Sequence, residues 1–106
     1  MAKEFMLTNF QEKVLSAIKK IPKGKVSTYA LVARGAGKPK AFRAVGNALH
    51  INPYAPVFPC HRVVKSDGSL GGYAGGVKKK IALLKKEGVS VKGNKVMNFH
   101  EILMRF

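Results

Sequence analysis

Prolines and glycines crowd one part of this 106-residue chain, between Pro53 and Gly76. Three of the five prolines and five of the eleven glycines fall within that stretch. Proline lacks the backbone N–H that helices and central strands use, and glycine weakens both kinds of element. Regular helices are therefore expected on either side of the stretch, with only short apolar pieces and turns inside it. The sequence predicts a mainly α fold with a small β-hairpin.

The first helix is expected to begin at a capping box, in which the Thr8 side chain caps the backbone amide of Gln11 and the Gln11 side chain reaches back. It should end at Pro22 and Gly24, since both residues stop a helix. Between these signals, apolar residues recur at the spacing of one helix face: Phe10, Val14, Ala17, Ile18 and Ile21.

Two more helices are expected before the proline-rich stretch. One is capped by Ser27 or Thr28 and ends at the glycines of 35–37. Pro39 suits the first turn of the other, which should end before Pro53 because the residue preceding a proline avoids the helical region. Two helices joined by a short glycine-containing turn, the second one basic, favour a winged helix-turn-helix-like DNA-binding domain. The apolar side of the second would hold Ala41, Val45, Ala48 and Leu49.

The second half of the chain is expected to contain two hairpins and one clear helix. Residues 66–68, Ser-Asp-Gly, are typical of a hairpin turn, and residues 89–97 alternate around Gly93-Asn94 as a second hairpin would. The helix should cover 77–86, with lysines on one face, and a further helical turn is predicted in 98–104. The opposite, apolar face of the 77–86 helix would hold Val77, Ile81 and Leu84.

The charge of the chain indicates a polyanionic partner. Twenty Lys and Arg residues against five Asp and Glu residues give a formal net charge of +15. Positive charges this numerous repel one another and destabilise the folded chain, and binding to nucleic acid is the simplest way to offset this repulsion. No apolar run approaches the roughly 18 residues of a membrane span, and no secretory signal is recognisable, so we expect an intracellular protein without a membrane partner. We expect one domain over 1–106, with its family-like core at 8–91, and the sequence assigns no role to the tail, 92–106.

Cys60 is the only cysteine, which excludes an internal disulfide and any zinc site built from several cysteines. Two readings of this residue stay open. It is either a buried, inert thiol, or a nucleophile, because the thiolate is the reactive form and the neighbouring His61 and Arg62 are groups that stabilise thiolates. We expect no metal and no cofactor.

The segment from Pro59 to Val64, with the sequence PCHRVV, resembles the active-site motif of the O6-alkylguanine-DNA alkyltransferases. Further segments follow in that family's order and spacing, over roughly residues 10–88. They are Gly24–Tyr29, Pro39–Gly46, Asn52-Pro53, Ser66–Gly68, Gly71–Gly76, and Lys80 through Leu83-Leu84 to Glu87-Gly88.

The resemblance implies that Cys60 accepts an alkyl group from O6 of guanine in DNA and is spent after one turnover. His61, oriented by Glu87, would take the thiol proton through a water, and Tyr29 would donate its hydroxyl to the leaving base. The base pocket would be formed by Asn52, Val63, Tyr73 and Ala74. Position 74 is serine in other members, and this alanine is expected to alter tolerance of bulky alkyl groups.

The resemblance also implies that the third helix docks in the minor groove of double-stranded DNA. Arg43 would enter the base stack in place of a flipped nucleotide, and Lys40 would contact the backbone. Small residues allow a close approach to the groove, and here they are Ala41, Ala44, Gly46 and Ala48. We expect a monomer, and no additional N-terminal domain of the kind that many members carry.

Two other functions remain possible from the sequence. An alkyltransferase-like protein binds the lesion without transferring its alkyl group. Such proteins replace the acceptor cysteine, usually by tryptophan, whereas this chain has Cys60 and no Trp. A basic architectural protein would explain the charge but would leave the residues around Cys60 unexplained.

Overall fold

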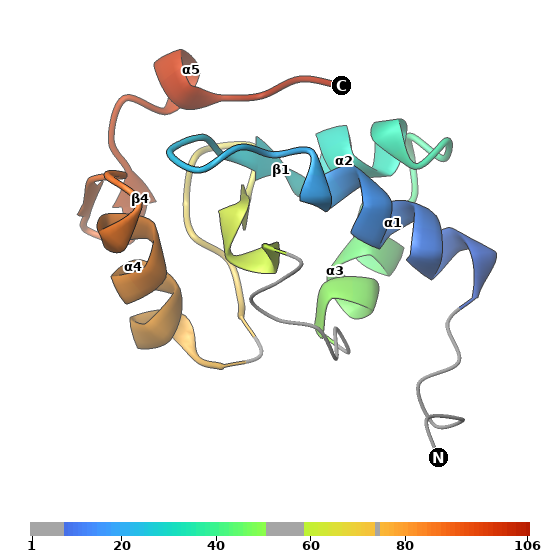
Figure 1. Cartoon of the computed structure of the whole chain (residues 1–106), viewed down its shortest axis with the longest axis horizontal. Coiled ribbons are helices and arrows are strands. Elements are labelled where there is room, and N and C mark those ends of the chain that lie inside the picture. Colours follow the sequence, from blue (N-terminus) through green and yellow to red (C-terminus); the bar gives the residue numbers. More distant parts are fainter. Residues whose placement is uncertain (1–7, 51–58, 74) are drawn as a thin grey trace.

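The structure is a computed structural model that describes residues 8–50, 59–73 and 75–106. In these residues the chain is mainly helical with two small sheets, which confirms the predicted fold class (Figure 1). The elements, in chain order, are α1 Asn9–Lys19, β1 Ser27–Thr28, α2 Tyr29–Gly35, α3 Phe42–His50, the 3-10 helix η2 Cys60–Arg62, β2 Val63–Val64, α4 Val77–Lys86, β3 Val91–Lys92, β4 Lys95–Val96 and α5 Phe99–Ile102.

The first two helices follow their sequence signals. Thr8 accepts a hydrogen bond from the Gln11 amide while the Gln11 side chain accepts one from the Thr8 amide, so the capping box is confirmed. Thr28, one of the two candidates, caps α2 by accepting from the Leu31 amide. The prediction for Pro39 is wrong: it lies in a turn, and α3 begins three residues later, at Phe42.

The turn predicted at residues 66–68 is present, but the hairpin predicted around it is wrong. The Lys65 amide donates to the Ser69 carbonyl across the turn, yet β2 pairs in parallel with β1 instead of with the chain that follows. Ser69 pairs with Lys95 of β4. The hairpin β3–β4, predicted around Gly93-Asn94, is confirmed. Pairing partners far along the chain therefore decide this part of the fold.

Two apolar cores lie on opposite sides of β2. Successive residues of a strand point to opposite faces, so Val63 packs into the core formed by α1, α2 and α3, while Val64 packs into a second core with Leu84 of α4. Figure 1 shows η2 and β2 between the three helices on one side and α4 with the hairpin on the other. Cys60 belongs to the helical core.

Helix α4 has the predicted bounds, and its buried face agrees with the prediction at Leu84 and Ile81 but not at Val77. Leu84 is buried and Ile81 is half-buried, whereas Val77 is exposed. Lys80, assigned to the solvated lysine face, is fully buried instead. The helix ends where expected, at Glu87 and Gly88, because Gly88 adopts the positive φ that a helix end of this kind requires.

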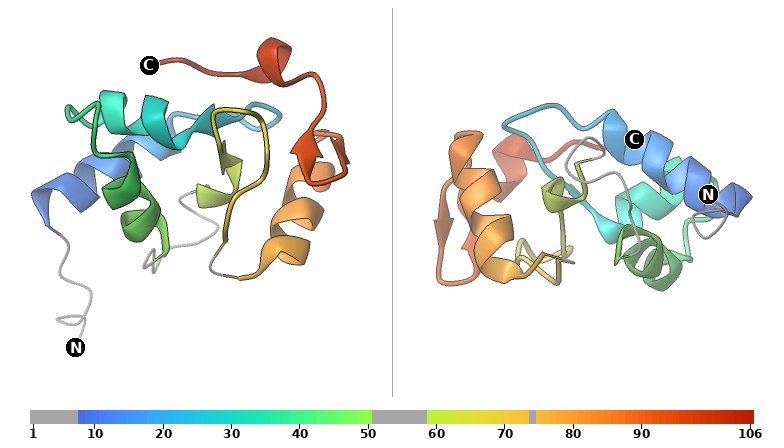
Figure 2. Two further views of the ribbon diagram at one scale, coloured as in Figure 1. Left: turned by 180° about the vertical axis from the view of Figure 1, so that it is seen from behind. Right: turned by 60° about the horizontal axis from the view of Figure 1, so that its bottom comes forward.

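The last residues run back across the molecule toward α2 (Figures 1 and 2). The predicted helical turn is confirmed as α5. Beyond it, the Met104 amide donates to the Val26 carbonyl, and Ser27 Oγ donates to the Met104 carbonyl. A Cβ on Gly35 would lie 2.8 Å from the Phe106 ring, so the tail packs closely on the end of α2.

No helix in the described part of the chain has the length and apolar character that crossing a membrane requires.

Candidate active site

Cys60 lies at the first turn of η2, where it is 5% exposed. A pocket of about 180 Å³ opens beside it. The residues around the pocket come from α2, α3 and the glycine-containing segment before α4: Tyr29, Gly46, Leu49, His50, Gly72 and Tyr73. Cys60 therefore belongs to the helical core and also lines a small pocket. A molecule bound in that pocket would contact Cys60.

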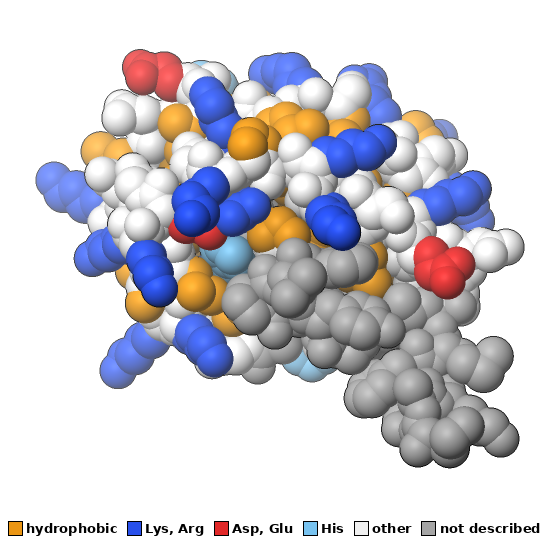
Figure 3. Space-filling view, viewed as in Figure 1, with side chains coloured by type: hydrophobic (Ala, Val, Ile, Leu, Met, Phe, Trp, Pro, Cys, Tyr) orange, Lys and Arg blue, Asp and Glu red, His pale blue; other side chains and the backbone are white. Residues whose placement is uncertain are grey.

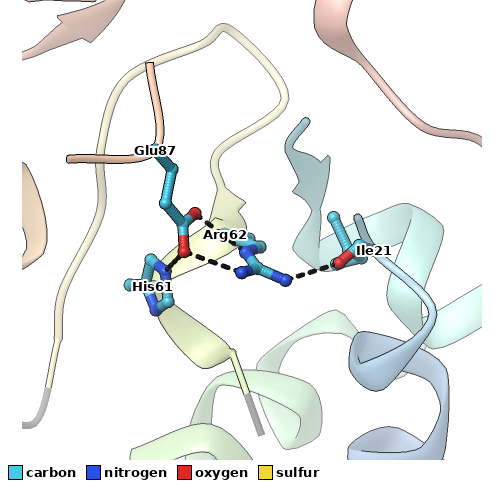
Figure 4. Close-up of polar contacts among 4 residues, drawn as sticks. All are labelled: Ile21, His61, Arg62 and Glu87. Atoms are coloured by element: carbon cyan, nitrogen blue, oxygen red, sulfur yellow. Dashed lines mark hydrogen bonds and ion pairs between the residues drawn. The ribbon is translucent and has the colours of Figure 1, made fainter. Parts of the chain in front are cut away.

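The next two residues of η2, His61 and Arg62, both contact the carboxylate of Glu87, which caps the C-terminal end of α4 (Figure 4). His61 Nε2 lies 3.0 Å from Glu87 Oε2. Arg62 donates to both oxygens of the same carboxylate, from Nε at 2.9 Å and from Nη2 at 2.7 Å, and its Nη1 donates to the Ile21 carbonyl at 2.7 Å. The contact predicted between His61 and Glu87 is therefore present, and Arg62 fixes the carboxylate that makes it.

Hydrogen bonding sets the charge on this carboxylate. Burial raises the pKa of Glu87, but the hydrogen bonds from Arg62 and His61 outweigh it, so that the pKa lies below its ordinary value. Glu87 is therefore an anion at neutral pH. An anionic carboxylate only accepts hydrogen bonds, so His61 Nε2 must carry a proton.

The other nitrogen of His61 is free to act as a base. Burial lowers the pKa of His61, with Glu87 opposing this and the charges of Arg62 and Lys80 adding to it, so the ring is neutral at neutral pH. With the proton on Nε2, Nδ1 presents a lone pair. Nδ1 is buried and has no hydrogen-bond partner among the described residues. An oriented, neutral imidazole with one open nitrogen is the arrangement that activates nucleophiles.

Lys80 is the buried cation of the site. Its Nζ donates to the carbonyls of Val63 at 2.7 Å, Leu70 at 2.5 Å and Gly72 at 3.2 Å. Three acceptors match the three donors of an ammonium group. Burial lowers the pKa of Lys80 to about 8, and the nearby Cys60 acts in the opposite direction. Lys80 thus ties the backbone of β2 to that of residues 70–72 and places a positive charge close to Cys60.

Two tyrosines frame the pocket. The Tyr29 hydroxyl donates to the Gly72 carbonyl at 3.4 Å, and burial, with a smaller contribution from Cys60, raises the pKa of Tyr29. Burial likewise raises the pKa of Tyr73, again with Cys60 contributing. Both phenols therefore stay protonated at neutral pH and remain hydrogen-bond donors.

The residues predicted to bind DNA lie on and before α3. Arg43 and Ala44 are exposed, Gly46 is half-buried, and Ala41 and Lys40 lie just before the helix. Ala48, which was expected on the same small-residue face, is buried in the helical core instead. Lysine and arginine side chains are spread over the face of the molecule seen in Figure 3, where acidic side chains appear at only a few places.

Two predicted pocket residues, Asn52 and Ala74, lie outside the described residues. Val63, the third residue predicted for the base pocket, is fully buried and is not among the described residues around the pocket; its carbonyl accepts from Lys80. Sequence reasoning gave no role to Lys80 and did not link Arg62 to Glu87. A signal existed for Lys80, because position 80 is four residues before the buried Leu84 and so shares its helix face.

The sequence is similar to those of proteins from a known family. Residues 9–89 match the family model described as 6-O-methylguanine DNA methyltransferase, DNA binding domain. The methylated-DNA–protein-cysteine methyltransferase of Methanothermobacter thermautotrophicus is 49% identical over 87 residues, which are 81% of this chain and 48% of that protein. That of Methanosarcina acetivorans is 51% identical over 81 residues, 76% of this chain and 52% of that protein. This chain thus spans about half the length of these relatives.

Solved structures are similar as well. Mycobacterium tuberculosis OGT in complex with DNA has a TM-score of 0.76 at 44% identity, over 78% of this chain and 51% of that one. Schizosaccharomyces pombe Atl1, in complex with damaged DNA containing O6-carboxymethylguanine, has a TM-score of 0.77 at 34% identity, over 95% of this chain and 100% of that one. With most of its length matched to the family model and the expected motifs in place around Cys60, the chain belongs to the 6-O-methylguanine DNA methyltransferase family.

Proposed function

We propose that this protein repairs O6-alkylguanine in double-stranded DNA by transferring the alkyl group to Cys60. The observation that supports this most directly is the arrangement beside the pocket, where Cys60 is followed by a neutral His61 whose Nε2 is fixed by Glu87 and whose Nδ1 has no partner. A spectator thiol would need neither an oriented base nor a buried cation next to it. The names of the relatives, methylated-DNA–protein-cysteine methyltransferases, agree with this activity.

The reaction is a displacement at carbon. The thiol proton passes to His61 Nδ1 through a water, and the Cys60 sulfur attacks the alkyl carbon, forming an S–C bond as the C–O6 bond breaks. The electron pair of that bond leaves with guanine, which takes a proton from the Tyr29 hydroxyl; solvent then returns a proton to the Tyr29 phenolate and takes one from the His61 imidazolium. The products are a thioether and an unmodified base. Because a thioether is a poor leaving group and no described residue is placed to reverse the step, each molecule acts once.

Access to the lesion requires that the nucleotide leave the duplex. Helix α3 presents an exposed Arg43 together with the small residues Ala44 and Gly46, a surface that suits close approach to a narrow groove. Arg43 fills the gap that the extruded nucleotide leaves. Lys40 and the other exposed lysines provide salt-dependent contacts with phosphates. One monomer suffices for one lesion.

The mass of the intact protein tests this proposal. The wild type and Cys60→Ala are incubated with a duplex carrying one O6-methylguanine, and with the matched undamaged duplex. We expect the wild type to gain one CH2 unit, located at Cys60 by peptide mapping, in a yield that never exceeds one per molecule. The Cys60→Ala variant should gain nothing and still bind the duplex.

Similarity to Atl1 over the whole length of that chain makes lesion binding without transfer the second candidate. If the wild type gains no mass but binds the O6-methylguanine duplex more tightly than the undamaged one, the protein is a lesion-binding protein and transfer is excluded. Equal affinity for both duplexes, without a gain in mass, would point to an architectural protein.

A further inference from the structure

Phe42 is a large apolar side chain that the fold leaves in solvent. It is 49% exposed at the start of α3. Two other large apolar side chains in the described residues are similarly exposed, Met97 at 42% and Val77 at 40%. Neither of these is aromatic, and neither lies on α3. Phe42 therefore places an open aromatic ring on the helix that carries Arg43.

A hollow of about 460 Å³, with mostly apolar walls, lies beside this ring. Phe42 and Gly46 form its α3 side; since they are four residues apart, they share one face of the helix. The other residues around it are Tyr29 and Ala30 of α2, and Lys65 and Ser66 of the turn after β2. Tyr29 and Gly46 also line the Cys60 pocket, so the two hollows are neighbours that share these two residues.

The surroundings of the ring indicate what would cover it. Lys65 is an exposed cation that lines the hollow, and Arg43, also exposed, follows Phe42 on α3, in a chain with a net charge of +15. A partner that brings a flat apolar surface together with negative charge fits this combination, and a nucleic acid does so through its bases and phosphates. Proteins that enter the minor groove use apolar side chains, Phe among them, as wedges between base steps.

We propose that Phe42 is a second wedge of α3, which stacks on a base of the duplex beside the nucleotide that enters the Cys60 pocket. The proposal rests on the function proposed above and adds a residue to it. Arg43 fills the space of the extruded nucleotide, while Phe42 covers a neighbouring base and keeps the opened duplex from closing. The contact involves the face of a base, so it is independent of sequence.

Affinity measurements test the contribution of the ring. Stacking of a base on an aromatic side chain predicts that Phe42→Ala weakens binding to duplex DNA about tenfold, and that Phe42→Leu, which keeps apolar bulk but no ring, recovers only part of this. No charge is removed, so the slope of affinity against salt concentration should stay unchanged. Met97→Ala, at a residue of similar exposure, should bind as the wild type does. If Phe42→Ala or Phe42→Leu binds like the wild type, the proposal is overturned.

Fluorescence tests the stacking itself. The chain contains no tryptophan, so Phe42→Trp creates a single reporter at the proposed contact, and Met97→Trp creates a matched reporter away from it. On titration with duplex DNA, stacking on a base should quench the emission of Phe42→Trp and leave that of Met97→Trp almost unchanged. Unquenched emission from Phe42→Trp at saturating DNA would rule the wedge out.

The two proposals can fail separately. If the wild type transfers the alkyl group but Phe42→Trp is not quenched, only the wedge is wrong. If quenching occurs but no alkyl transfer is found, the transfer proposal is wrong and Phe42 remains a DNA contact. If the wild type binds no DNA, both are wrong.

Discussion

Between residues 8 and 50 the chain is stabilised by apolar side chains, whereas from residue 59 onward buried charged side chains contribute as well. In the first region Val14, Ile18 and Val32 are fully buried in the core between α1, α2 and α3. In the second region, Lys80 and Arg62 donate to backbone carbonyls. Helices satisfy their own carbonyls, but irregular backbone needs other donors.

The difference has a consequence for the site. Lys80 and Arg62, the side chains that hold the irregular backbone, also act on the site: Lys80 lies near Cys60, and Arg62 fixes the Glu87 carboxylate that contacts His61. In the helical region, as far as the structure describes it, the exposed charges of α1 make no contact with Cys60, His61 or Glu87, so a change there should leave the chemistry unaffected. In the second region, stability and reactivity depend on the same charged groups, so substitutions of Lys80, Arg62 or Glu87 should change both.

The largest effect is expected for Lys80→Met. Methionine fills the space, but it leaves the carbonyls of Val63, Leu70 and Gly72 without their donor, which should lower the free energy of unfolding by about 2–4 kcal/mol. Urea denaturation measures this. Alkyl transfer should be slower even at temperatures where the variant is folded, since a positive charge near Cys60 is lost. The matched control, Lys79→Met on the exposed side of α4, should change neither quantity. A Lys80→Met variant as stable as the wild type would contradict the role given to this ammonium.

Glu87→Gln should have a smaller effect that depends on pH. At neutral pH it weakens charged hydrogen bonds with Arg62 and His61, a loss of about 1–3 kcal/mol. Because the folded pKa of Glu87 lies below its ordinary value of 4.5, its contribution is complete above that pH and is lost as the pH falls through the lower, folded pKa. Denaturation between pH 3 and 7 should therefore show the two proteins converging in acid.

The control for this series is Glu12→Gln, at an exposed position of α1. At neutral pH its free energy of unfolding should differ from that of the wild type by less than that of Glu87→Gln does. A constant difference between Glu87→Gln and the wild type at every pH would show that the carboxylate contributes no charge-dependent stability.

The smallest effect is expected in the helical region. Thr8→Ala removes the side-chain half of the capping box on α1 and should cost about 1 kcal/mol of unfolding free energy, equally at all pH values where Glu87 titrates. Transfer rates well below the unfolding temperature should not change. Ser16→Ala, at an exposed position within α1, is the control and should be close to neutral. Slower transfer by Thr8→Ala would mean that the two regions are coupled more strongly than their contacts indicate.

Local signals predicted the helices and the second hairpin well. The capping box, the apolar spacing and the end at Gly88 each act within a few residues, so α1, α2 and α4 lie where the sequence indicated. The signal at Pro39 was misread because a proline that opens a helix and one that forms a turn look alike in sequence. The pairing of β2 with β1 joins residues far apart in the chain, and no local pattern reports it.

Some contacts of the site could likewise be predicted from local motifs, and others depend on packing between distant segments. The motif around Cys60 indicated His61 and, through the family resemblance, Glu87, and these two side chains are in contact. Arg62 was noticed only as a neighbour of Cys60 in sequence. Its contact with the Ile21 carbonyl could not be read from the motif, because it depends on how η2 packs against the end of α1.

Most of the helices, the strong basic charge and the motif around the single cysteine can be recognised without a structure, because they depend on neighbouring residues or on composition. The burial of Lys80 and the exposure of Phe42 are a result of how the chain packs. Burial depends on what packs against a side chain, and here the packing partners come from segments far away in the sequence. For that reason Lys80 of α4 is buried although it is charged, and Phe42 of α3 is exposed although it is apolar.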